Sequence, residues 1–302
     1  MGITKSQIKE YASSMGMAMC GVSGVDRFET SPRGSHPCDI LPGCKSVIVV
    51  GAALIDGVIQ VNFRAFEEGR FDLKGIYGTY GYSTLPNFEL TYVCYAMARY
   101  IESNSDAVAT PCSTGPMTNG FQISIRHAAV AAGLGELGHM SIVITPEFGP
   151  RARFGVILTT MEIEPDPVYD GKRLCNAEKC GICAKVCPTG AIKPYHEDED
   201  LKRVEIGGKA YDYPLVNIPK CAKALMALTK SLGGKEDYLT EKEPTMADIS
   251  AASAKKPPDN MGLAGSSWHC GRCQTYCPVG DWGNRYKKTG LSSGPVIIEE
   301  KL

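Results

Sequence analysis

The first half of the chain combines apolar residues at helical spacing with a nearly continuous apolar run. Residues 4–15 open with a capping-box pattern and continue as one apolar helical face, which predicts an amphipathic helix. Residues 46–54 are rich in valine and alanine and favour a buried strand. A longer helix is predicted to start at a capping Asn87. Its expected buried face comprises Leu90, Val93, Cys94, Met97 and Ile101.

An alanine-rich helix is predicted next, over residues 123–132, followed by strand patterns at 141–145 and 154–160. This mixture predicts an α+β or α/β fold. The 302-residue length favours two domains, and the two prolines that flank Asp166 mark a boundary. The expected organisation is an α/β domain of residues 1–165, a smaller domain of residues 166–290 and a tail of residues 291–302.

Two further segments of the second half carry a pattern. Cys221, Leu225, Leu228 and Leu232 recur at helical spacing, and the glycines that follow provide a stop. Residues 235–267 contain paired prolines and many small or charged residues, which predicts a long loop. Loops of that length are disordered or functional in most proteins.

Composition excludes several functional classes. A hydrophobic content of 43% and a charged content of 22% are typical of globular proteins. The net charge is −1 and no run of Lys or Arg exceeds two residues, so a nucleic-acid partner is not expected. The N-terminus has no signal-peptide core or twin arginine, and the longest apolar stretch is interrupted by Asp56. We therefore expect a cytoplasmic protein without a membrane partner.

The cysteines carry the main chemical signal. The chain has thirteen, of which seven stand in two short blocks that each end in Cys-Pro, with one more between the blocks. A C-x2-C-x3-C-Pro run is how bacterial-type ferredoxins bind [4Fe–4S] clusters. Free thiols without an export signal also indicate a reducing, anaerobic cytoplasm. The eight expected ligands of two clusters are Cys175, Cys180, Cys183, Cys187, Cys221, Cys270, Cys273 and Cys277.

In such ferredoxins the cysteine before proline binds the other cluster. The crossed pattern gives one cluster Cys175, Cys180, Cys183 and Cys277, and gives the other Cys187, Cys221, Cys270 and Cys273. Zinc is the alternative metal, since C-x2-C pairs also form zinc sites. Two assignments stay open: four residues rather than two separate Cys175 from Cys180, and Cys221 could be a buried core residue. The other five cysteines have no ligand spacing.

Residues 133–138 satisfy the G-x-G-x-x-G pattern of dinucleotide-binding loops. That pattern binds a pyrophosphate only where a strand precedes the glycines and a helix follows. Here the order is reversed, because an alanine-rich helix precedes the glycines and a strand follows. We therefore reject nicotinamide binding and interpret the glycines as a tight turn or a site of close backbone approach.

The run from Arg126 to Gly155, which contains Gly-Leu-Gly-Glu and Ile-Thr-Pro-Glu, resembles the superfamily of reductive dehalogenases and epoxyqueuosine reductases. The resemblance covers about residues 80–280, including the order of the cysteines. It implies a nitroreductase-like domain that binds a corrinoid such as cobalamin, followed by a ferredoxin-like domain with two [4Fe–4S] clusters. His139 is expected to be a hydrogen-bonding or surface residue rather than a cobalt ligand. The residues implied to contact the corrinoid are Gly133, Leu134, Gly135, Glu136, Gly138, His139, Ile144, Thr145 and Pro146.

The chain departs from both branches of that superfamily. Epoxyqueuosine reductases carry an acidic residue where this chain has Asn119, and an amide cannot donate a proton as a carboxylic acid does. They also continue for longer after the last cluster, and respiratory dehalogenases carry a twin-arginine leader. These differences predict a short cytoplasmic branch with its own substrate.

The first hypothesis is a corrinoid-dependent reductase of a small, for example halogenated, organic substrate. A ferredoxin or flavodoxin would supply electrons, and the resemblance implies Tyr80 or Tyr82 as the proton donor, with Arg126 as its basic partner. Arg126 could equally bind a corrinoid or a carboxylate or form a structural ion pair, and either tyrosine could be an aromatic packing residue. The alternative is an electron-transfer protein without catalysis, such as the reductive activator of another corrinoid protein. Reduction of epoxyqueuosine in tRNA ranks below both. A homodimer is compatible with either hypothesis.

Overall fold

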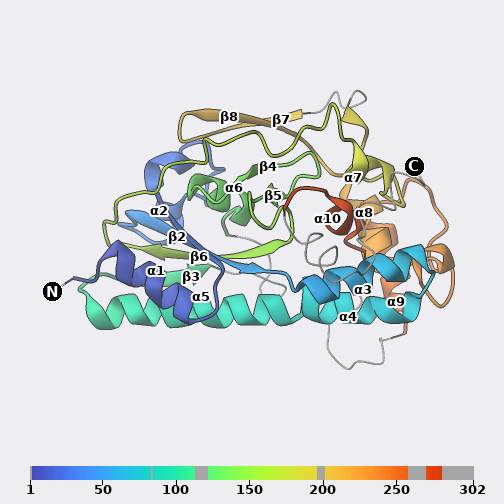
Figure 1. Ribbon diagram of the computed structural model, residues 1–302, viewed down its shortest axis with the longest axis horizontal. Helices are drawn as coiled ribbons and strands as arrows, with labels where there is room; N and C mark the ends of the chain where they lie inside the picture. The colour runs from blue at the N-terminus through green and yellow to red at the C-terminus, as the bar shows by residue number, and fades with distance from the viewer. Residues whose placement is uncertain (1, 83, 113–121, 196–200, 258–269, 281–302) are drawn as a thin grey trace, which may run out of the picture.

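The computed structural model describes residues 2–82, 84–112, 122–195, 201–257 and 270–280 (Figure 1). Its centre is a four-stranded antiparallel sheet with the order β1-β2-β6-β3. The strands are β1 (Met19–Gly24), β2 (Ser46–Ala53), β6 (Ala152–Thr159) and β3 (Ala109–Cys112). β2 and β6 pair over their whole length, from Ser46 opposite Thr159 to Ala53 opposite Ala152. The predicted strand at residues 46–54 is therefore confirmed as a central, buried strand.

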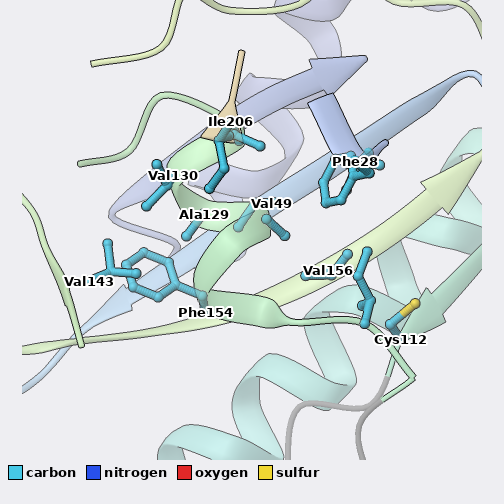
Figure 2. Packing of buried hydrophobic residues seen from close by; sticks show 14 of the residues in the cluster. Phe28, Val49, Cys112, Ala129, Val130, Val143, Phe154, Val156 and Ile206 are labelled. Carbon is cyan, nitrogen blue, oxygen red and sulfur yellow. The ribbon is translucent and has the colours of Figure 1, made fainter. Parts of the chain in front are cut away.

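Alternate residues of the central strands enter two different cores, as the two-residue period of a strand requires. Ile48 and Ile157 pack against α1 (Lys5–Ser14) and the long α5 (Thr84–Asn104). Val49 and Val156 pack on the other face against α6 (Ile125–Ala131), as Figure 2 shows. The sheet is thus covered by helices on both faces (Figure 1).

Both long N-terminal helices follow their sequence patterns closely. The capping box of α1 is present, since the Thr4 side chain accepts from the Gln7 amide and the Gln7 side chain binds the Thr4 amide. The predicted buried face of α5 is confirmed. Its predicted start is wrong, because α5 begins at Thr84 and Asn87 lies inside the first turn. The Asn87 side chain instead accepts a 2.9 Å hydrogen bond from Arg153.

The predicted strand at residues 141–145 is mostly replaced by a short hairpin. Only β5 (Val143–Ile144) is extended, and it pairs with β4 (Glu136–Leu137). Ser141 has a φ of 57°, which turns the chain between them. α6 runs into the glycine turn and β4 leaves it, so the helix-before-strand order that excludes a dinucleotide loop is confirmed.

A second hairpin covers α6 and joins the N-terminal core to the second half of the chain. It consists of β7 (Leu201–Ile206) and β8 (Lys209–Pro214). Ile206 packs in the same core as Val130 of α6 (Figure 2), together with Tyr211 and Tyr213. A further core joins Phe63 to Val186 and Tyr276. Buried contacts therefore cross the expected boundary at residue 165.

The cysteine-rich half is built from short helices. They are α7 (Ile182–Lys185), α8 (Ile218–Leu225), α9 (Met246–Lys255) and α10 (Arg272–Tyr276). The helix predicted to reach Leu232 is too long, because α8 ends at Leu225 and Ala227 has a φ of 48°. The long loop predicted for residues 235–267 is also wrong in part, because α9 lies within it and starts with a capping box at Thr245.

The end of the sheet nearest these helices is extended by α3 (Asp56–Glu67), which packs against α10. α4 (Lys74–Ile76) and a π-helical turn, η3 (Tyr77–Tyr82), follow and lead into α5. The remaining short elements are η1 (Val25–Phe28), α2 (Pro37–Ile40), η2 (Phe71–Leu73) and η5 (Lys230–Leu232). In the described part of the chain, no helix combines the length and apolar content needed to cross a bilayer.

Candidate metal centre

Cys183 lies near thiols from both cysteine blocks. Burial, with smaller contributions from the neighbouring Cys175, Cys277 and Cys180, raises the pKa of its thiol to about 12. Burial likewise raises the pKa of Cys277 to about 11, and the neighbouring Cys175 and Cys180 contribute to the rise. These four residues form the first thiol set.

A second thiol set lies beside the first. Burial, together with Cys270 and Cys187, raises the pKa of Cys221 to about 12. The pKa of Cys273 is raised well above its ordinary value by burial, then by Cys270, Cys221, Cys183 and Cys187. Cys221 therefore lies near block cysteines, and its role as a ligand rather than a core residue stays a prediction. The second thiol set comprises Cys187, Cys221, Cys270 and Cys273.

All thirteen cysteines are free thiols. Among the described residues, no three Cys, His, Asp or Glu side chains converge closely enough to share one metal ion. A [4Fe–4S] cluster does not need such convergence, because each thiolate binds a different iron. The donor set fits this group, since buried thiols become thiolates only where a metal offsets the cost of burying the charge.

The two blocks reach this arrangement through the same local structure. Gly181 and Gly271 each follow the first cysteine of a C-x2-C pair, and each precedes a short helix. Their φ values of 60° and 75° lie in the left-handed region that glycine adopts without strain. A side chain at Gly271 would also overlap the phenol of Tyr77. The glycine after the first cysteine of each pair was a sequence signal for this turn.

Arg151 anchors the second cysteine block to the sheet through hydrogen bonds. Its buried guanidinium donates to the carbonyl oxygens of Gln274 at 3.0 Å, of Cys277 at 2.9 Å and of Val279. Asn62 of α3 donates to the carbonyl oxygen of Cys270 at 3.0 Å and to Oγ1 of Thr275 at 2.8 Å. Sequence inspection missed both residues, because a lone arginine or asparagine has no ligand spacing.

Tyr82 is one of the two expected proton donors, and it lies near the second thiol set. Burial raises its pKa, and the thiols of Cys221, Cys273 and Cys270 raise it further. The guanidinium of Arg153 lies 5.0 Å from the ring centre and opposes this shift. The ring of Tyr82 also stacks on Tyr77, with centres 6.0 Å apart.

The other expected catalytic residues lie elsewhere. Tyr80 is 47% exposed. Arg126 donates to the carbonyl oxygen of Ser141, and the guanidinium that lies over the Tyr82 ring is that of Arg153. Asn119 lies outside the described residues. Arg153 was missed because it stands far from the tyrosines in sequence.

Most residues expected to contact a corrinoid are covered by the chain itself. Gly133 and Leu134 are partly exposed and Pro146 is exposed. A side chain at Gly133 or Gly135 would overlap the carbonyl oxygen of Pro167 or of Ile144. The segment therefore does not fit as an open surface for a large planar cofactor. The residues buried against other parts of the chain are Gly135, Glu136, Gly138, His139, Ile144 and Thr145.

A comparison with protein families matches residues 178–193 to the 4Fe-4S binding domain. This match covers the end of the first block, so iron–sulfur binding is supported there. The remaining cysteines lie outside the matched segment.

Curated relatives fall into two groups. A tetrachloroethene reductive dehalogenase of Sulfurospirillum multivorans is 42% identical over 77 residues, which are 26% of this chain and 15% of the relative. An epoxyqueuosine reductase of Gloeobacter violaceus is 29% identical over 187 residues, which are 59% of this chain and 50% of the relative. The chain thus spans half or less of the length of these two relatives.

Solved structures of both groups share the fold. An epoxyqueuosine reductase with a tRNA stem loop covers 91% of this chain and 64% of its own, with a TM-score of 0.53 at 16% identity. A catabolic reductive dehalogenase in complex with 3-bromo-4-hydroxybenzoic acid covers 82% and 33%, with a TM-score of 0.51 at 18% identity. The chain is therefore similar in sequence to both the reductive dehalogenases and the epoxyqueuosine reductases, and it shares their fold.

Proposed function

We propose that this chain is an iron–sulfur reductase that passes electrons through two [4Fe–4S] clusters to an acceptor beside Tyr82. The observation that carries the proposal is that cysteines of both blocks and Cys221 gather in one region of the fold, where Cys183, Cys187, Cys273 and Cys277 share a core. In the proposal these cysteines bind two clusters by the crossed ligand pattern of two-cluster ferredoxins. A ferredoxin or flavodoxin is the electron donor in the proposal.

Tyr82 supplies the proton in this proposal. Its raised pKa keeps the phenol protonated at neutral pH, so the proton is present when the substrate needs it. After transfer, the charge of Arg153 stabilises the phenolate. Asn87 orients Arg153 by accepting its 2.9 Å hydrogen bond. For a halogenated substrate, replacement of the halogen by hydrogen then takes two electrons from the clusters and one proton from Tyr82, and the halogen leaves as halide.

A corrinoid is the acceptor that the resemblance implies. The glycine segment does not fit it in this structure, so we derive no step through it. Cobalamin uptake is accordingly a separate experiment, and neither the cluster assignment nor the role of Tyr82 depends on its result.

Two substrate classes have equal support among the relatives. Reductive dehalogenases favour a small halogenated organic compound. Epoxyqueuosine reductases favour epoxyqueuosine in tRNA, and one of their structures holds a tRNA stem loop. The expectation against a nucleic-acid partner rests on net charge and on Asn119, which lies outside the described residues, so we do not rank it below the small substrate.

Iron analysis tests the proposal directly. Protein purified without oxygen is expected to contain about eight iron and eight sulfide per chain. Cys221→Ala is expected to lose the second cluster, whereas Cys94→Ala, which replaces a buried thiol outside both sets, should retain all the iron. Zinc in place of iron, or full iron in Cys221→Ala, would contradict it. The reduced protein is then assayed with a halogenated phenol and with the modified tRNA stem loop to identify the substrate class.

A further inference from the structure

A buried carboxylate binds the start of the first cysteine block. Oε1 of Glu136 accepts the backbone N–H of Leu174 at 2.7 Å and that of Cys175 at 2.8 Å. Glu136 lies in β4 and is 8% exposed. Hydrogen bonds to a charged group are stronger than neutral ones, and more so away from water. The carboxylate therefore holds the backbone of Cys175 firmly against β4.

The neighbouring His139 binds both sides of the same block. Its backbone N–H lies 3.4 Å from Sγ of Cys175, and its ring Nε2 donates to the carbonyl oxygen of Lys193 at 2.8 Å. Lys193 lies beyond the last cysteine of the block, whereas Cys175 is its first. The segment from Glu136 to His139 thus forms hydrogen bonds at both ends of the first cysteine block.

These hydrogen bonds explain how Cys175 can serve despite its longer spacing from Cys180. The carbonyl oxygen of Asn176 accepts from the backbone N–H of Lys179 at 3.2 Å and of Cys180 at 3.0 Å. This turn takes up the two extra residues between Cys175 and Cys180. A turn alone leaves the direction of its first residue free, and Glu136 removes that freedom by binding two consecutive amides.

We propose that Glu136 is a positioning residue that fixes Cys175 as a ligand of the first cluster. The inference rests on the proposed function, because it requires that the first thiol set bind a cluster. It assigns the conspicuous Gly-Leu-Gly-Glu segment to the support of the iron–sulfur site rather than to a corrinoid surface. The negative charge of Glu136 also lowers the reduction potential of the cluster that Cys175 binds.

Four variants purified without oxygen test this role. Cys175→Ala removes the ligand and Glu136→Ala removes its support, so both are expected to lose about half of the iron. Glu136→Gln retains an acceptor oxygen but not the charge, so it is expected to keep its iron and to raise the potential of the first cluster. The matched control is Glu102→Ala, because Glu102 accepts a 3.0 Å hydrogen bond from the backbone of Ala109 on the exposed surface.

The readouts are iron and sulfide content, the electron paramagnetic resonance spectrum of the reduced protein, and a redox titration. Wild-type protein without clusters would defeat the proposed function itself. Wild-type protein with two clusters and full iron in Glu136→Ala would overturn only the role of Glu136. If Glu136→Ala does not fold, Glu136→Gln tests the role instead, because a reduction potential and a spectrum equal to those of the wild type would overturn it. A Glu136 variant that keeps full iron but loses cobalamin uptake would also overturn the role, in favour of a corrinoid contact.

Discussion

The phenol of Tyr77 donates a 3.0 Å hydrogen bond to Oε1 of Gln274, and this bond joins the π-helical turn η3 to the second cysteine block. Both side chains are buried. Nε2 of Gln274 donates in turn to the carbonyl oxygen of Pro150, so three separate segments meet at this glutamine. Gly271 leaves the space that the Tyr77 ring occupies.

Tyr77→Phe is therefore expected to lower the free energy of unfolding by about 1–3 kcal/mol, because Gln274 keeps a buried acceptor without its donor. Thermal unfolding followed by circular dichroism measures this. Tyr92→Phe is the matched control, since Tyr92 is 63% exposed. Equal unfolding midpoints for the two variants would contradict the prediction.

Arg151→Met is expected to release the second cysteine block. Three backbone carbonyl oxygens lose a charged donor, and each such bond contributes about 1.5–3 kcal/mol. Iron content should fall together with the unfolding midpoint, because Cys277 is one of the anchored residues. Arg99→Met, on the exposed side of α5, serves as the control and should retain both. Full iron in Arg151→Met would show that the block holds its shape without this anchor.

Tyr82→Phe is expected to reduce turnover by about 10²–10⁴-fold, the usual range for loss of a general acid. Its iron content should stay at the wild-type level. Arg153→Gln should reduce turnover as well, because the phenolate then lacks its counter-charge. Tyr80→Phe separates the two candidate tyrosines and should leave turnover unchanged. Steady-state assays of reduced protein decide between them, and a larger loss in Tyr80→Phe would reverse the assignment.

Gly135→Ala is expected to destabilise the fold and to lower iron content in parallel. The added methyl group would overlap the carbonyl oxygen of Ile144, a backbone atom that cannot move without opening the β4–β5 hairpin. Gly57→Ala in α3 is the control, because its added methyl group meets open space. Wild-type stability of Gly135→Ala, measured by thermal unfolding, would mean that the hairpin shifts freely.

The free energy of unfolding is expected to decrease as the pH is lowered, because of one partly buried histidine. Burial, then the charges of Arg126 and Lys202, lowers the pKa of His127 from 6.5 to about 4. The unfolded chain therefore binds this proton at a higher pH than the folded chain does. The contribution of neutral His127 to the free energy of unfolding is complete above pH 6.5 and is lost as the pH falls towards 4.

Because this imidazole is partly exposed, we expect a loss of about 1–2 kcal/mol rather than the full value of the shift. Unfolding midpoints of wild-type protein and His127→Gln at pH 7.5 and pH 5 measure it. The wild type should lose more on acidification than the variant. Equal losses would mean that His127 titrates normally in the folded protein.

The sequence by itself determined the features that depend on local spacing. The capping box before α1, the buried face of α5 and the central strand β2 follow from periodicity, because burial on one face imposes that period. The cysteine blocks could also be recognised from the sequence as candidate cluster ligands, since ligand spacing along a turn is a local property. The structure brings cysteines of both blocks together, and their division between two clusters by the crossed Cys-Pro motif stays a prediction.

Only the tertiary structure decided which distant side chains meet. Arg153 lies against Tyr82 because β6 pairs with β2 and brings residue 153 beneath the start of α5, a contact that no sequence period reports. Glu136 binds the amide of Cys175 from 39 residues away. The Gly-Leu-Gly-Glu segment resembles a ligand-binding loop in the sequence, whereas in the fold it packs against the backbone of the chain itself. Long-range packing sets such partners, and the local pattern of the chain does not encode them.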